Sequence, residues 1–235
     1  MYAKRSEELM NAITTNAAEL GLKVNSKKNQ MVCLNGNMNC DITSFIRAQD
    51  GEKINSGQTM KILGFYFGTR PTVQSHIDEM TKKFRKRLWL IRNLKNAKAT
   101  QKDLLDSYCS FIRPILDYCS SVYHPMINKT SSDHLEKLQK TALKLIYGFD
   151  KSEEKLLEMS GITTLKERRN NQFNKFCLSL HNNRRFKEVW LEDREFTGPN
   201  VRKQKIIKEK QSRTNRLYTS PLYSIRRRLN DILVT

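Results

Sequence analysis

The chain has 235 residues, of which 38% are hydrophobic, and its 43 Lys and Arg against 24 Asp and Glu give a formal net charge of +19. This composition supports a folded core, and the charge makes a polyanion such as RNA, DNA or an anionic membrane the natural partner. The five cysteines are odd in number and contain no CxxC pair, which argues against a disulfide framework and a zinc module. No apolar run is long enough to cross a membrane.

The first part of the chain predicts one helix and a few strands. Apolar residues recur at helical spacing over residues 6–20, and Gly21 stands where a helix C-cap belongs. The segments "LKVN" and "QMVCL" predict a hairpin, and residues 35–59 read as loop or sheet edge with one weak strand candidate, "ITSFIRA". The segment "MKILGFYFG" predicts a strand that Gly68 closes.

From residue 75 onward the sequence predicts helices joined by short polar turns. The first carries one apolar stripe at a spacing of three or four residues, and the second starts near Gln101 and is kinked at Pro114. Further helices are expected after residues 131–133, read as N-cap residues, and over residues 152–159 and 164–181. Residues 198–220 read as a basic linker or arm before a closing helix from Pro221.

The acidic residues and histidines predict no catalytic metal site. The chain contains neither an Asp-Asp pair nor a D-x-D motif, and its four histidines lack metal-ligand spacing. Asp103 and Asp106 lie three residues apart, and we interpret them as acids favoured by a helix N-terminus.

The strongest signal is the cationic helix that begins near residue 75. Eight Lys and Arg residues lie between positions 82 and 98, and no acidic residue occurs from Thr81 to Lys102. Like charges on adjacent turns repel one another unless a polyanion neutralises them. We therefore expect this helix to contact nucleic acid, although a solvated helix face stays the alternative. Binding to a membrane surface is less favoured, because the apolar stripe is needed for the core.

Four segments in this order resemble the C-terminal part of the reverse transcriptase of non-LTR retrotransposons, of the Jockey-like and related lineages: "LGLKVNSKKNQMVCL", "ILGFYFGTRPTVQSHIDEMTKKFRKRLWLIRNLK", "LLDSYCSFIRPILDYCSSVYHP" and "LEKLQKTALKLIYG". The later "GITTLKERRNNQFNKF" and "RTNRLYTSPLYSIRRRLND" are similar to segments that follow the thumb in that family. The resemblance covers nearly the whole chain and implies an α+β, mainly α fold.

The resemblance also implies a division of the chain and roles for individual residues. Residues 1–74 would be a partial palm with an antiparallel hairpin, residues 75–197 a helical thumb-like domain and residues 198–235 a basic C-terminal extension. Lys28 matches the lysine of the fourth palm motif, and Asn25 would support its turn. Leu63, Gly64 and Phe65 match the primer-grip hairpin, although an aromatic residue usually precedes Leu-Gly in the family and Ile62 stands there in this chain. The expected contacts to a template-primer duplex come from Lys82, Lys83, Arg85, Lys86, Arg87 and Arg92.

The family's aromatic-Ala-Asp-Asp motif would lie just upstream of the first helix, and "MYAKRSEEL" does not contain it. We therefore expect a truncated element or a partial gene model that is inactive as a polymerase by itself. Mg²⁺ would belong only to the full-length enzyme. The expected partners are RNA, DNA or an RNA–DNA duplex, with no membrane and no small-molecule substrate, in the nucleus or the cytoplasm. The alternative is a host-used basic helical module that binds nucleic acid or a protein.

Overall fold

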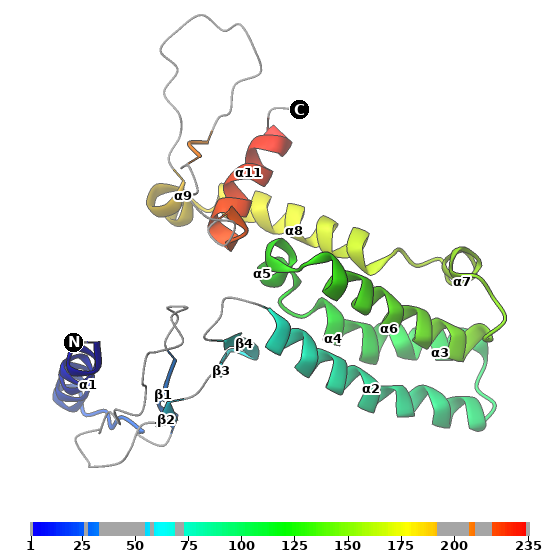
Figure 1. The fold of residues 1–235 in the computed structure, drawn as a ribbon, viewed down its shortest axis with the longest axis horizontal. Coiled ribbons are helices and arrows are strands. Elements are labelled where there is room, and N and C mark those ends of the chain that lie inside the picture. The colour runs from blue at the N-terminus through cyan, green and yellow to red at the C-terminus, as the bar shows by residue number, and fades with distance from the viewer. Residues whose placement is uncertain are drawn as a thin grey trace, which may run out of the picture. The chain divides into compact units, whose positions relative to one another are not determined.

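The computed structural model describes residues 2–25, 28–32, 55–56, 59–68, 73–191, 207–209 and 218–233. Helices dominate these residues and two short sheets accompany them, so the fold class is α+β, mainly α, as predicted (Figure 1). The chain divides into two compact units, Met1–His76 and Ile77–Thr235. The first unit ends at His76, and the sequence-based division placed its end at residue 74.

The first unit begins with helix α1 (Tyr2–Glu19), which starts before the predicted residue 6. Two residues after its end, Gly21 adopts the left-handed conformation. The short strand β1 (Gln30–Met31) pairs in parallel with β2 (Asn55–Ser56). The predicted hairpin between "LKVN" and "QMVCL" is therefore wrong, because residues 22–25 form no strand. The strand candidate "ITSFIRA" lies outside the described residues.

The segment that the local pattern predicted as one strand is a tight antiparallel hairpin, which is the element that the resemblance implied there. Strands β3 (Thr59–Ile62) and β4 (Phe65–Gly68) pair so that Ile62 faces Phe65, which leaves only Leu63 and Gly64 in the turn. Both turn residues have positive φ, 47° and 84°, as a type I′ hairpin turn requires. The apolar run was long enough for a single strand, but the glycine within it allows the chain to reverse.

The second unit is helical. Its elements lie at the predicted positions, apart from the short segments α5, η3 and α9, which no pattern had indicated. They are α2 (Gln74–Asn96), α3 (Gln101–Ser107), the π-helix η2 (Tyr108–Ile112), α4 (Arg113–Asp117), α5 (Ser120–Tyr123), the 3₁₀-helix η3 (His124–Met126), α6 (Lys129–Tyr147), α7 (Glu153–Ser160), α8 (Leu165–Asn182), α9 (Arg184–Trp190) and α11 (Pro221–Leu233).

Two helix boundaries differ from the prediction for identifiable reasons. Helix α6 begins at Lys129, because the side chain of Asn128 accepts the backbone N–H of Ser131 at 2.7 Å and so acts as the N-cap. The predicted cap residues 131–133 lie inside the helix, within its first two turns. The kink expected at Pro114 takes the form of the π-helix before it, and Pro114 occupies the first turn of α4, where no helical hydrogen bond requires its missing N–H.

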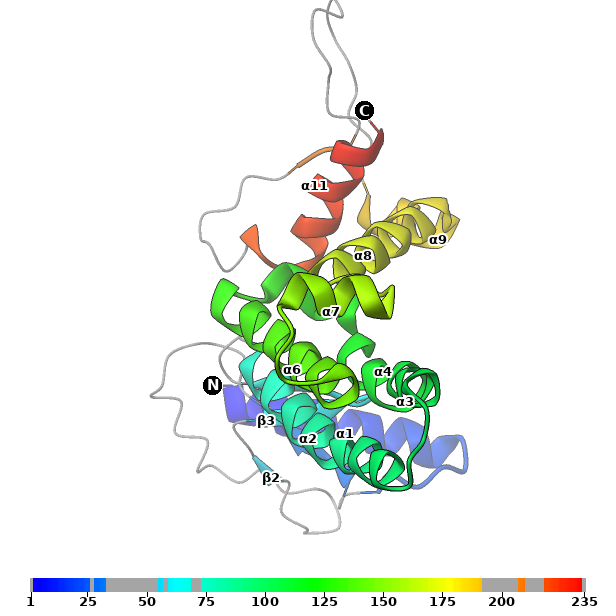
Figure 2. The same cartoon turned by 90° about the vertical axis from the view of Figure 1, so that its right-hand side faces the viewer.

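Helices α2 and α6 run side by side in the same direction, as Figures 1 and 2 show. Near the start of α2, the hydroxyl of Thr81 lies 3.2 Å from the imidazole Nε2 of His134. Near its end, the ammonium of Lys95 donates to the carbonyl of Leu145 at 2.6 Å. The predicted apolar stripe of α2 is buried, including Ile77, Met80, Phe84, Leu88 and Ile91. The opposite side of α2 is thereby held toward solvent.

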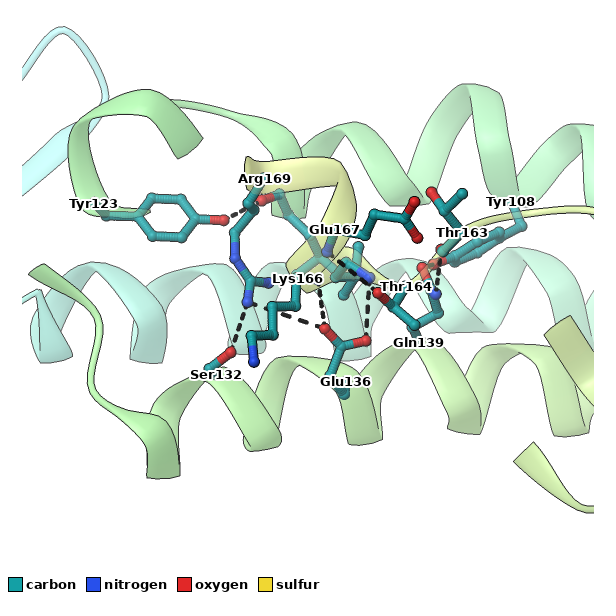
Figure 3. Close-up of polar contacts among 12 residues, drawn as sticks. Tyr108, Tyr123, Ser132, Glu136, Gln139, Thr163, Thr164, Lys166, Glu167 and Arg169 are labelled. Carbon is teal, nitrogen blue, oxygen red and sulfur yellow. Dashed lines mark hydrogen bonds and ion pairs between the residues drawn. The ribbon is translucent and has the colours of Figure 1, made fainter. Parts of the chain in front are cut away.

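A polar network ties α6 to the start of α8, as Figure 3 shows. The carboxylate of Glu136 accepts the backbone N–H groups of Leu165 at 3.1 Å and Lys166 at 2.6 Å, two donors that have no partner within the helix. Arg169, only 1% exposed, donates to the hydroxyl of Ser132 at 2.7 Å and lies 4.0 Å from Glu136. This one carboxylate thus caps a helix and balances a buried charge.

The end of the chain packs onto α8 through a second core cluster. Phe173 and Cys177 of α8 are buried together with Leu191, Ile207, Ile225 and Leu229. The side-chain amide of Asn230 accepts the backbone N–H of Ile207 at 2.8 Å and donates to its carbonyl at 3.0 Å. The predicted basic arm is therefore fixed to α11 at residues 207–209.

His124 should make this unit sensitive to acid. Its ring lies 5.2 Å from that of Phe173, and burial, with smaller contributions from Arg169 and Arg228, lowers its pKa from 6.5 to about 4. Between these values the unfolded chain binds more protons than the folded one, so the free energy of unfolding should fall as pH drops from 6.5 toward 4. Chemical denaturation across this range should show a smaller loss for His124→Phe. An identical pH dependence in both proteins would contradict this role.

Candidate nucleic-acid interface

The predicted phosphate contacts all lie on α2 and all are exposed. The buried stripe includes Phe84, Leu88 and Ile91, so the intervening cations point away from the core. The six predicted residues, all of them exposed, are Lys82, Lys83, Arg85, Lys86, Arg87 and Arg92. The structure therefore brings all six predicted residues together on one helix.

Two of the six cations have partners within the protein. Lys82 donates to the carboxylate of Glu79 at 2.6 Å, and the guanidinium of Arg87 donates to the backbone carbonyl of Phe111 at 2.6 Å. The bond to Lys82, together with the charges of Lys83 and Lys86, holds the pKa of Glu79 below its usual value. The uncompensated charge expected from the sequence is thus reduced at the start of the helix, because Glu79 lies one turn before Lys82.

The other four cations make no hydrogen bond or ion pair within the described part of the chain. We call Lys83, Arg85, Lys86 and Arg92 the free cations. They lie within ten consecutive residues of a single helix, and at a rise of about 1.5 Å per residue they extend over roughly 14 Å of its axis. Such a group can accept several phosphates of a nucleic-acid backbone, since it need not break internal ion pairs to do so.

An exposed tryptophan lies among the free cations and was not recognised in the sequence. The side chain of Trp89 is 64% exposed, with Arg85 four residues before it and Arg92 three residues after it. Residues at these spacings are neighbours on a helix surface. The signal was present, because the apolar stripe passes through positions 84, 88 and 91 and leaves position 89 on the outer side.

The three primer-grip-like residues differ in exposure: Leu63 is exposed, Gly64 is half-buried and Phe65 is buried. Leu63 is 88% exposed at the tip of the hairpin, in a left-handed conformation that is uncommon for a leucine. Gly64 completes the turn. The ring of Phe65 is instead buried and lies 4.3 Å from the ring of His76. Only the turn itself therefore offers apolar surface and backbone to a ligand.

Lys28, the expected palm-motif lysine, is exposed in the first unit. Its backbone N–H donates to the backbone carbonyl of Asn25 at 3.0 Å. The free cations belong to the second unit, whereas Lys28 and the hairpin belong to the first.

The sequence predicted no metal site among the acidic residues. Asp103 was expected near a helix N-terminus, and it lies there. It forms a capping box with Thr100 at the start of α3, in which each side chain accepts the other residue's backbone N–H. In the described ranges, no three His, Cys, Asp or Glu side chains gather closely enough to hold a metal ion.

Among the described helices, none is long and apolar enough to cross a membrane.

Comparison with known proteins identifies no relative: no family model, no curated protein and no solved structure matches the chain.

Proposed function

We propose that the chain is the nucleic-acid-binding C-terminal part of a reverse transcriptase of the non-LTR retrotransposon type. It would bind RNA, DNA or an RNA–DNA duplex through the outer face of α2, and would work in the nucleus or cytoplasm, where such partners occur. The observation that carries the proposal is the set of four free cations on one helix whose opposite side is buried. Burial of Phe84 and Ile91 fixes the orientation of that face before any ligand binds.

The order of elements supports the same proposal. A two-residue hairpin turn with an exposed leucine precedes the cationic helix, and a helical unit follows, which is the order that the sequence resemblance implies. The formal charge of +19 adds a long-range attraction for any polyanion. The four free cations should contribute more to the binding of nucleic acid than four exposed cations elsewhere on the protein.

A matched pair of variants tests this claim. The first changes Lys83, Arg85, Lys86 and Arg92 to Ala, and should lower affinity for an RNA–DNA duplex at least about 100-fold at ~0.1 M salt. The second removes the same charge from four other helices by changing the exposed residues Lys102, Lys137, Lys155 and Lys166 to Ala.

Fluorescence anisotropy with a labelled duplex measures both affinities, and circular dichroism verifies that both variants are folded. Binding through the α2 face predicts a much larger loss for the first variant. Equal losses would show that total charge alone attracts the duplex, and an unaffected first variant would exclude the α2 face.

The proposal also predicts no polymerase activity for residues 1–235 by themselves. Catalysis of this kind needs carboxylates that hold Mg²⁺ against the nucleotide phosphates, and the sequence contains no Asp-Asp or D-x-D pair. A primer-extension assay with Mg²⁺ should yield no product above background. Extension that persists after contaminating polymerases have been removed would show this part of the proposal to be wrong.

A further inference from the structure

Trp89 is a large aromatic side chain on the most polar side of α2. Leu88, just before it, and Ile91, two residues after it, are buried, whereas its own side chain is 64% exposed. Within the described residues it takes part in no hydrogen bond or ring contact, and no cation lies over its ring. An indole in water contributes nothing to the core, so the fold does not explain its presence.

The surroundings of Trp89 indicate which kind of ligand would cover it. Arg85 and Lys86 lie one turn before it and Arg92 lies one turn after it, and all three are free cations. An apolar protein partner would have to remove these charges from water without compensation, which is costly. A nucleic-acid strand instead supplies an aromatic base for the indole and phosphates for the cations.

We propose that Trp89 stacks on an unpaired nucleobase while Arg85 and Arg92 bind phosphates on either side of it. This inference rests on the proposed function and narrows its substrate to a strand with at least one unpaired nucleotide. In a continuous duplex both faces of a base are covered by neighbouring bases, so an indole on the side of a helix has no base to stack on. Unpaired bases stack readily on aromatic side chains.

Because the chain has only two tryptophans, its own fluorescence can report the contact. Trp190→Phe leaves Trp89 as the single indole, and Trp190 is itself 49% exposed, so its replacement should leave the fold intact. Titration of this variant with a single-stranded oligonucleotide should quench the emission of Trp89 strongly. A blunt duplex of the same sequence should bind with little quenching.

Affinity gives an independent measure of the same contact. Trp89→Ala should weaken binding to the single strand by about 5- to 150-fold, the range found for loss of one base–aromatic stack, and should leave duplex binding nearly unchanged. Trp190→Ala is the matched control and should affect neither ligand.

The outcomes separate this inference from the proposed function. If the α2 charge variant loses affinity while Trp89→Ala retains it for the single strand, stacking is overturned and the nucleic-acid function stands. Equal losses for single strand and duplex would also overturn stacking on an unpaired base. If wild-type protein binds neither ligand, both proposals fail.

Discussion

Replacing Glu136 by Ala should lower the free energy of unfolding by about 3 kcal/mol. The substitution leaves the guanidinium of Arg169 in the core without its nearby carboxylate, and it removes the acceptor for the N–H groups of Leu165 and Lys166. Both effects act at the junction of α6 and α8. Urea denaturation followed by far-UV circular dichroism measures the loss.

Glu158→Ala is the matched control for this prediction. Glu158 is exposed near the end of α7, and its side chain makes no hydrogen bond or ion pair to the described residues. Its removal should therefore change stability by less than about 0.5 kcal/mol. If the two variants were equally stable, Glu136 would not be the residue that joins the two helices.

Substitutions on the two sides of α2 should differ strongly in their effect on the free energy of unfolding. Phe84 is fully buried, and its replacement by Ala should cost about 3 to 5 kcal/mol through lost burial and the cavity left behind. Trp89→Ala removes a larger side chain from the same helix but should cost less than about 0.5 kcal/mol, because the indole lies mostly in water.

Thermal or urea unfolding of these two variants tests the orientation of the helix directly. A strong destabilisation by Trp89→Ala would mean that the indole is part of the core, and the face that carries the free cations could not then be the outer one. A small loss of stability for Phe84→Ala would likewise mean that the side of α2 that carries Phe84 is not the buried one.

Much of the helical unit could be predicted from local sequence patterns. The apolar stripe of α2 follows the helical period. Ser152 and Thr164 cap the starts of α7 and α8, and Gly148 caps the end of α6. These features depend on interactions between residues a few positions apart, so they can be predicted from short stretches of sequence. The exposure of the α2 cations follows from the same period.

Features that depend on distant residues could not be predicted in this way. Glu136 caps a helix that begins 29 residues later in the chain, and the burial of Arg169 results from the packing of α6 against α8. The parallel pairing of β1 with β2 joins segments that no local pattern connects. The partners of Lys82 and Arg87 also appear only once the fold is known, and they reduce six candidate cations to four free ones.

The salt dependence of binding tests the nucleic-acid interface most directly. Affinity for one duplex is measured over a range of salt concentrations for the wild type, the α2 charge variant and the control charge variant. If the four free cations each displace a counterion from the duplex, the slope of log affinity against log salt should become shallower by about 3 to 4 in the α2 variant. It should change less in the control. Parallel lines for the wild type and the α2 variant would contradict the account.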